Sequence, residues 1–95
     1  MNPKRLHAAI LDVHTLASGR SKVTYRAGLG DGVLTAHTAP LTSPEGAAAA
    51  RELRRHQRSW PLSLLRTTAV EITAETLPDG STLHIISPAQ PSLAA

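Results

Sequence analysis

Residues 2–19, NPKRLHAAILDVHTLASG, decide how many helices the chain is expected to have. Asn2 can cap a helix, and Pro3 would then take the first helical position, where its missing N–H costs nothing. Apolar residues follow at helical spacing, and Gly19 is a typical C-terminal stop. We therefore expect a first helix that starts at Pro3 and stops before Gly19.

A second helix start follows in the middle of the chain. Ser43, Pro44 and Glu45 supply a cap, a proline at the first position and an acid in the first turn. The stretch that follows is rich in alanine, leucine and arginine, which are good helix formers. We expect this helix to run to about Trp60, because Pro61 cannot continue it.

Two pairs of alternating segments predict β-hairpins. Residues 21–27 and 33–38 are joined by a loop dense in Gly and Asp, GLGDG. Residues 67–77 and 82–87 alternate in the same way and are joined by the turn sequence PDGS. Alternation between turn signals is typical of half-buried antiparallel strands.

These elements predict an α+β fold with the order α-β-β-α-β-β. The economical packing is a two-layer sandwich, a four-stranded antiparallel sheet with both helices on one face. The same order would result from circular permutation of a ferredoxin-like unit, a likeness of topology that implies no function. We expect residues 1–87 to form this single domain and residues 88–95 to be a flexible C-terminal tail. The last three residues, Leu-Ala-Ala, resemble the end of the bacterial trans-translation degradation tag, a likeness that chance explains in so short a stretch.

The second helix carries the candidate binding residues. Four arginines fall on one face, about 100° wide: Arg51, Arg54, Arg55 and Arg58. The nearly opposite face gathers the residues expected to meet the sheet: Gly46, Ala49, Ala50, Leu53 and Trp60. The arginines should therefore be exposed, and three further basic residues could extend them: Lys4, Arg5 and Lys22.

Charge is divided unequally along the chain, whose formal net charge is +3. Residues 1–66 hold all ten basic side chains and four acids, and residues 67–95 hold three acids. Either an anionic partner binds the first part, or the two parts pair with each other. We expect a small nucleic-acid-binding or accessory protein whose helix contacts phosphates. The competing interpretation is an ordinary solvated helix face, and with only Tyr25 and Trp60 as aromatics, base stacking is nearly excluded.

An alternative function is a protein-interaction module, an adaptor, inhibitor or chaperone-like partner. Its binding surface would be an edge strand or the polar sheet face, comprising Thr24, Arg26, Thr35, His37, Glu71, Thr73, Glu75, His84 and Ile86. A small sheet commonly protects its edges by pairing, so a homodimer is expected. The arginines would then meet an acidic protein surface or nothing.

Several function classes are disfavoured. The chain has no Cys, so disulfide scaffolds and thiol chemistry are excluded. No signal peptide and no long apolar run is visible, which favours a soluble, cytoplasmic protein without a membrane partner. GLGDG lacks the Lys and Ser/Thr of a P-loop, and no nucleophile motif is present, so we expect no catalysis. The five histidines show no convincing metal-ligand spacing, so neither a metal nor another cofactor is expected.

Overall fold

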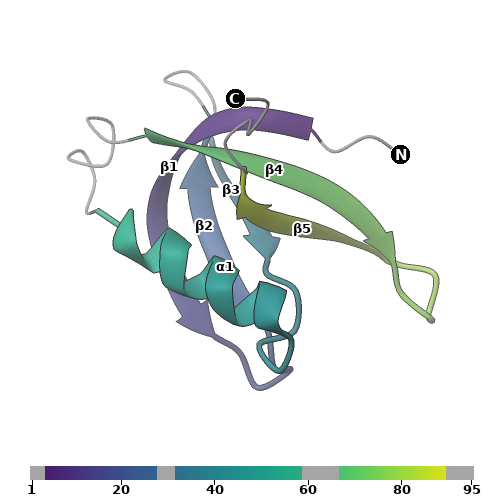
Figure 1. Cartoon of the computed structure of the whole chain (residues 1–95). Coiled ribbons are helices and arrows are strands. Elements are labelled where there is room, and N and C mark those ends of the chain that lie inside the picture. Colours follow the sequence, from purple (N-terminus) through teal and green to yellow (C-terminus); the bar gives the residue numbers. More distant parts are fainter. Residues whose placement is uncertain (1–3, 28–31, 59–66, 90–95) are drawn as a thin grey trace, which may run out of the picture.

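The computed structural model describes residues 4–27, 32–58 and 67–89, which form a closed five-stranded barrel with one helix (Figure 1). The elements are β1 (Lys4–Thr15), β2 (Ser21–Arg26), β3 (Val33–His37), α1 (Pro44–Arg55), β4 (Thr67–Thr76) and β5 (Thr82–Pro88). Around the barrel the strands follow the order β1-β2-β3-β5-β4, with β4 pairing back onto β1. The expected two-helix sandwich on an open four-stranded sheet is therefore wrong.

The first expected helix is the long strand β1. It pairs with β2 on one side and with β4 on the other. Leu6, Ala8 and Ile10 alternate toward the core, but the register shifts between Ile10 and Asp12, so the next buried residue is Val13. This β-bulge changes the spacing of the inward residues from two to three. Their positions therefore imitate the i, i+4, i+7 pattern of a helix. Asn2 and Pro3, the expected cap, lie outside the described residues.

Both expected hairpins are confirmed. β2 and β3 pair antiparallel, and Val23 and Tyr25 of β2 are buried in the core. Burial raises the pKa of the Tyr25 hydroxyl. β4 and β5 also pair antiparallel, and Gly80 turns the chain between them with φ +90°, a conformation that favours glycine.

The expected polar sheet face is wrong for β5. Ile86 pairs with Ile72 and is fully buried in the barrel core. Side chains alternate along a strand, so His84 faces the same side as Ile86, while Leu83 and Ile85 face the other side. The sequence did not determine which side chains of β5 face the core, because the segment TLHIIS has apolar residues at both odd and even positions.

The barrel closes weakly between β3 and β5. These two strands run parallel and are paired at one position, His37 with Ile85. Within the described residues, the earlier part of β3 therefore pairs only with β2, and Val33 and Leu34 are 52% and 44% exposed. Figure 1 shows the β4–β5 hairpin extending away from the barrel beyond this point.

Helix α1 starts as the sequence predicts and ends earlier than expected. The Ser43 hydroxyl accepts a hydrogen bond from the Gly46 N–H at 3.1 Å, which caps the first turn. The helix lies across one end of the barrel against β1 and β5 (Figure 1). Its last residue is Arg55, with His56 as the C-cap. The expected inward face is confirmed for the residues that the structure describes: Gly46, Ala49, Ala50 and Leu53.

The C-terminal boundary of the fold lies later than expected. Pro88 is the last residue of β5, and the Ala89 N–H donates to the Ala69 carbonyl at 2.9 Å. These two residues, expected to begin the tail, are therefore attached to β4. The rest of the expected tail lies outside the described residues. Among the described helical residues, no segment has the length and apolarity needed to cross a membrane.

Candidate anion-binding groove

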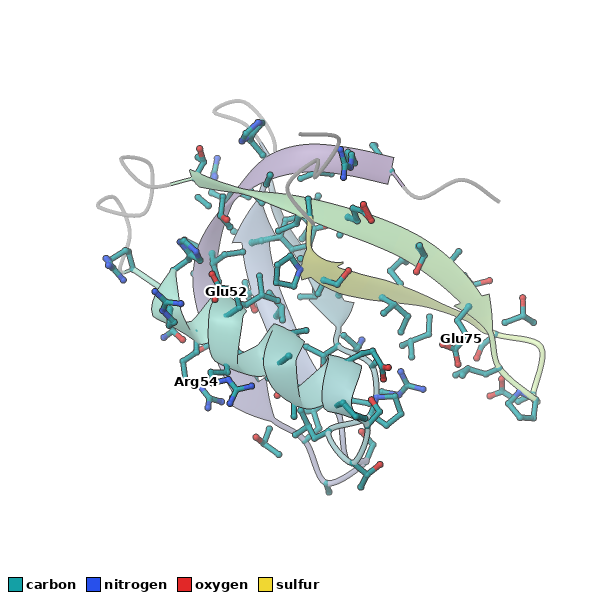
Figure 2. All side chains as sticks on the ribbon, viewed as in Figure 1. Glu52, Arg54 and Glu75 are labelled. Carbon is teal, nitrogen blue, oxygen red and sulfur yellow. The ribbon has the colours of Figure 1, made fainter. Side chains whose placement is uncertain are left out.

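Helix α1 has a basic flank and an acidic flank. Figure 2 shows Glu52 and Arg54 projecting from opposite sides of the helix. Helical geometry explains this, because two positions along a helix correspond to a rotation of about 200°. Each flank borders a separate groove against the barrel, and Arg51 lines both grooves.

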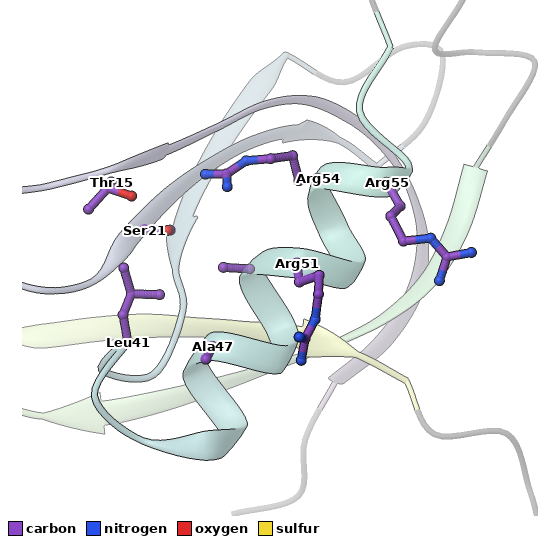
Figure 3. A pocket seen from close by; sticks show the side chains of 8 residues that line it. Thr15, Ser21, Leu41, Ala47, Arg51, Arg54 and Arg55 are labelled. Atoms are coloured by element: carbon purple, nitrogen blue, oxygen red, sulfur yellow. The ribbon is translucent and has the colours of Figure 1, made fainter.

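The basic flank borders an open groove of about 570 Å³. We call it the α1 groove, and its lining comes from α1, from the adjoining ends of β1 and β2, and from the segment before the helix: Thr15, Ser21, Leu41, Ala47, Ala50, Arg51, Arg54 and Arg55 (Figure 3). None of these residues is acidic. The groove therefore concentrates positive charge beside an apolar floor.

The three arginines of the groove differ in what they can reach. In Figure 3 the Arg54 side chain extends toward the strands that carry Thr15 and Ser21, while Arg55 turns to the other side of the helix. Arg55 donates to the Glu52 carboxylate at 2.9 Å. Among the described residues, Arg51 and Arg54 form no ion pair. Arg54 is therefore the side chain best placed to contact an anion in the groove.

Ser21 lies beneath this groove with an unsatisfied hydroxyl. Its backbone is fully bonded, because the Ser21 N–H donates to the Thr38 hydroxyl at 3.1 Å and the Ser21 carbonyl accepts from the Thr38 N–H at 2.9 Å. Its side chain is fully buried, yet the hydroxyl oxygen has no hydrogen-bond partner within the described residues. A buried hydroxyl left unpaired costs about 1–3 kcal/mol, so a polar group entering here would gain a partner.

Arg58, the fourth predicted site residue, closes the end of the helix. It lies beyond α1, and its guanidinium donates to the carbonyls of Arg55 and Gln57 at 3.1 and 2.7 Å. A cation at a helix C-terminus is stabilised by the helix dipole. Its backbone N–H donates to the Ile10 carbonyl at 3.0 Å, beside the β1 bulge. Arg58 therefore has a structural role that the helical spacing did not indicate.

Basic residues also gather at the start of β2. Lys22 follows Ser21 and pairs across the sheet with His37. Burial, followed by the charges of Lys22 and Arg20, lowers the pKa of His37. Arg20 donates to the Thr38 carbonyl at 3.2 Å and reaches Glu75 at 3.5 Å. Burial is the main cause of this lowered pKa, and the two positive charges beside the ring add to it.

Lys4 and Arg5 are not brought to the α1 groove. They begin β1, whereas the groove meets the last residue of that strand, Thr15. Arg5 pairs with Glu71 on β4 at 3.1 Å. The structure therefore brings together Arg51 and Arg54 in the groove and separates the two N-terminal residues from them. Lys22 lies on the adjoining strand and is not part of the described groove lining.

The acidic flank of α1 borders a second groove of about 550 Å³. Three carboxylates line it: Glu45, Glu52 and Glu71. Arg51 is its only basic residue among those described. Within the described residues no group of three or more ligating side chains is placed to hold a metal ion. The described lining of this second groove is therefore more acidic than that of the α1 groove, although Glu52 is paired with Arg55 and Glu71 with Arg5.

Sequence reasoning missed three residues of the α1 groove: Thr15, Ser21 and Leu41. Thr15 was placed inside an expected helix, Ser21 at the start of a strand, and Leu41 in a connector. Only the barrel closure brings these segments to one side of α1, and no local pattern carries that information.

Comparison with known protein families, with curated proteins and with solved structures finds no significant match.

Proposed function

We propose that this protein is a small, non-enzymatic nucleic-acid-binding protein that holds a single strand by its phosphates. The observation that carries the proposal is the pair of exposed guanidinium groups, Arg51 and Arg54, on a groove whose described lining holds no acidic residue. Neither group is engaged in an ion pair with a described residue. Arginine is suited to this task because its planar donors match phosphate oxygens.

The architecture is compatible with this proposal. The strand order β1-β2-β3-β5-β4 in a five-stranded barrel resembles that of the OB-fold, whose barrels bind oligonucleotides and oligosaccharides. Such a likeness does not assign a function. Barrels of this kind that bind single strands combine a positive groove with a surface that follows the nucleic-acid backbone.

The proposed path of the strand runs from the α1 groove onto the outer side of β2. Ser21 lines the groove, and Lys22, next along the strand, points to the opposite side because strand side chains alternate. A backbone that passes around this rim would meet Arg54 first and Lys22 next. Tyr25 is buried, so the described surface offers no aromatic platform, and binding should depend little on base identity.

The test is fluorescence anisotropy with labelled single-stranded DNA, single-stranded RNA and duplex DNA at several salt concentrations. We compare the wild type with the double variant Arg51→Gln/Arg54→Gln. For single strands, log K falls with log salt by about 0.7 per phosphate contacted, so removing two contacts should reduce the slope by about 1.4. We expect the single strand to bind most tightly and the variant to lose most of this affinity at low salt.

The matched control is Lys4→Gln/Arg5→Gln, which removes the same charge from the far end of β1. Equal losses in both double variants would show attraction by net charge alone and would overturn the proposed site. Absence of binding at low salt would overturn the function. Circular dichroism and thermal unfolding establish that each variant is folded.

A specific observation favours a second candidate, a protein-interaction module that pairs through an edge strand. Within the described residues, β3 is unpaired on one side before His37, and its two exposed apolar residues are Val33 and Leu34. Such an edge can add a strand from a second copy of the chain. Sedimentation equilibrium of the wild type and Leu34→Lys measures the oligomeric state and tests this candidate. A dimer that the substitution dissociates supports this candidate, and a monomer at high concentration rejects it.

The cellular location follows from these proposals. A cysteine-free, basic chain that binds nucleic acid fits the cytoplasm, and we propose that compartment. Fractionation of cells that express the tagged protein would test it.

A further inference from the structure

We infer that the α1 groove is a nucleotide site, in which Arg54 holds the phosphate and the hydroxyls of Thr15 and Ser21 bind beside it. This inference rests on the proposed function, because it specifies the ligand unit that the same helix flank binds. It goes further in assigning the ligand to one position in the open α1 groove instead of to the whole stripe of arginines.

The charge of the groove selects an anion. Among the residues that the structure describes, its lining contains arginines and no carboxylate, whereas the groove on the other flank of α1 contains Glu45, Glu52 and Glu71. Arg54 projects toward the strand ends that carry Thr15 and Ser21 (Figure 3). A phosphate between these residues would accept a charge-assisted hydrogen bond from the guanidinium, and such bonds are stronger than neutral ones.

The buried Ser21 hydroxyl is an independent sign of a missing partner. It has no exposed surface and no hydrogen-bond partner within the described residues, although it lies at the groove. Nearly all buried hydroxyl groups in folded proteins are paired, so the exception requires an explanation. A phosphate oxygen at the groove floor would accept its proton and remove the deficit after a small shift of the residues that cover this hydroxyl.

The remaining lining is apolar and sets the size of the ligand. Leu41, Ala47 and Ala50 form this part. A volume of about 570 Å³ lies within the range of small-molecule sites, roughly 300–1,000 Å³, and exceeds what a bare phosphate needs. The ligand class is therefore a phosphate attached to a less polar body, a nucleotide. It can be a free mononucleotide or one unit of a bound strand.

The experiment is a titration of ¹⁵N-labelled protein, followed by amide shifts, with three probes: adenosine 5′-monophosphate, adenosine and inorganic phosphate. We expect the monophosphate to shift the amides of Thr15, Ser21 and Leu41 and to bind more tightly than either other probe. Adenosine binding as tightly as its monophosphate would overturn the inference, because the groove would then be only an apolar surface.

Two variants and a control test the assigned residues. Arg54→Gln should weaken monophosphate binding by about tenfold, which is the effect of losing one charge-assisted hydrogen bond. Ser21→Ala should fold normally, because its side-chain oxygen makes no bond with the described residues, and should weaken binding by a smaller factor. Lys4→Gln is the control, because it removes one positive charge from the far end of β1, away from the groove. An equal loss in Arg54→Gln and Lys4→Gln would overturn the assignment.

Competition with oligothymidylate separates this inference from the proposed function. Mutual displacement, with both ligands weakened by Arg54→Gln, places the nucleotide site on the strand path. Monophosphate binding that oligothymidylate does not displace shows a mononucleotide site, and it overturns the strand path while keeping this inference. Strand binding without monophosphate shifts in the groove overturns this inference and keeps the proposed function.

Discussion

Gly46, in the first turn of α1, packs directly against the carbonyl oxygen of Pro40, and there is no room between them for a methyl group. A Cβ at this position would also overlap the Ala39 carbonyl. The contact holds the start of the helix against the segment that leads into it. That segment contains Leu41, so the same contact positions part of the α1 groove.

Gly46→Ala should therefore destabilise the protein. In an exposed helix the same substitution stabilises by about 1 kcal/mol, because alanine is the better helix former. Here the clash is with backbone, which moves only if the helix start shifts, and overpacking of this kind costs about 1–3 kcal/mol. Chemical denaturation gives the free energy of unfolding. The control Ala48→Gly, at an exposed position, should lose at most about 1 kcal/mol, and an unchanged or higher stability for Gly46→Ala would contradict the packing argument.

The parts of the fold that the sequence predicts are those with local signals. Ser43 and Pro44 predict the start of α1, and the two hairpins follow from alternation and turn residues. The first strand could not be predicted in this way, because the bulge after Ile10 gives its inward residues a helical spacing. Pairing with β4, over sixty residues away in the chain, decides the outcome and has no local signature.

The candidate site also has one part that the sequence predicts and another part that it does not. Arg51 and Arg54 could be predicted as exposed, because the apolar pattern of α1 orients them. The separation of these two arginines from Arg5 and their closeness to Ser21 could not be predicted, because both depend on the order of the strands in the barrel. The role of Arg58 also depends on where the helix ends, and the pattern extended that end by several residues.

The segment after α1 is attached to the β1 bulge by Gln57. Its side-chain oxygen accepts a hydrogen bond from the Val13 N–H at 3.2 Å, a group near the register shift. Gln57→Ala would leave this part-buried N–H unpaired and should cost about 1 kcal/mol of unfolding free energy. Gln57→Glu keeps an acceptor oxygen and should retain most of the stability. Equal losses in the two variants would show that the hydrogen bond does not hold the segment.

His37 should titrate below its usual range, because burial and the charges of Lys22 and Arg20 lower its pKa. Lys22→Gln removes one of these charges and should raise the pKa of His37 part of the way back, since burial is the larger cause. NMR titration of the His37 ring resonances measures both values. A pKa that Lys22→Gln leaves unchanged would show that the cross-strand pair does not couple electrostatically.

The same shift makes stability depend on pH. The unfolded chain binds a proton at His37 near the usual value of about 6.5, while the folded protein resists protonation until a lower pH. The unfolded state thus holds more protons in this window, and stability rises with pH there. The contribution of His37 is complete above about pH 6.5 and is lost as the pH falls through the folded value. In His37→Gln this part of the pH dependence should disappear from denaturation curves.

Binding of a polyanion should reduce the shift in the pKa of His37. Phosphates beside Lys22 would offset the positive charges that lower the pKa of this ring, so the bound state should take up a proton more readily than the free state. By linkage, affinity for single-stranded DNA should increase as the pH falls from about 7.5 to 5.5. Anisotropy titrations at constant salt measure this slope, and His37→Gln should flatten it. A slope that persists in His37→Gln would assign the proton uptake to another histidine and would remove the start of β2 from the proposed strand path.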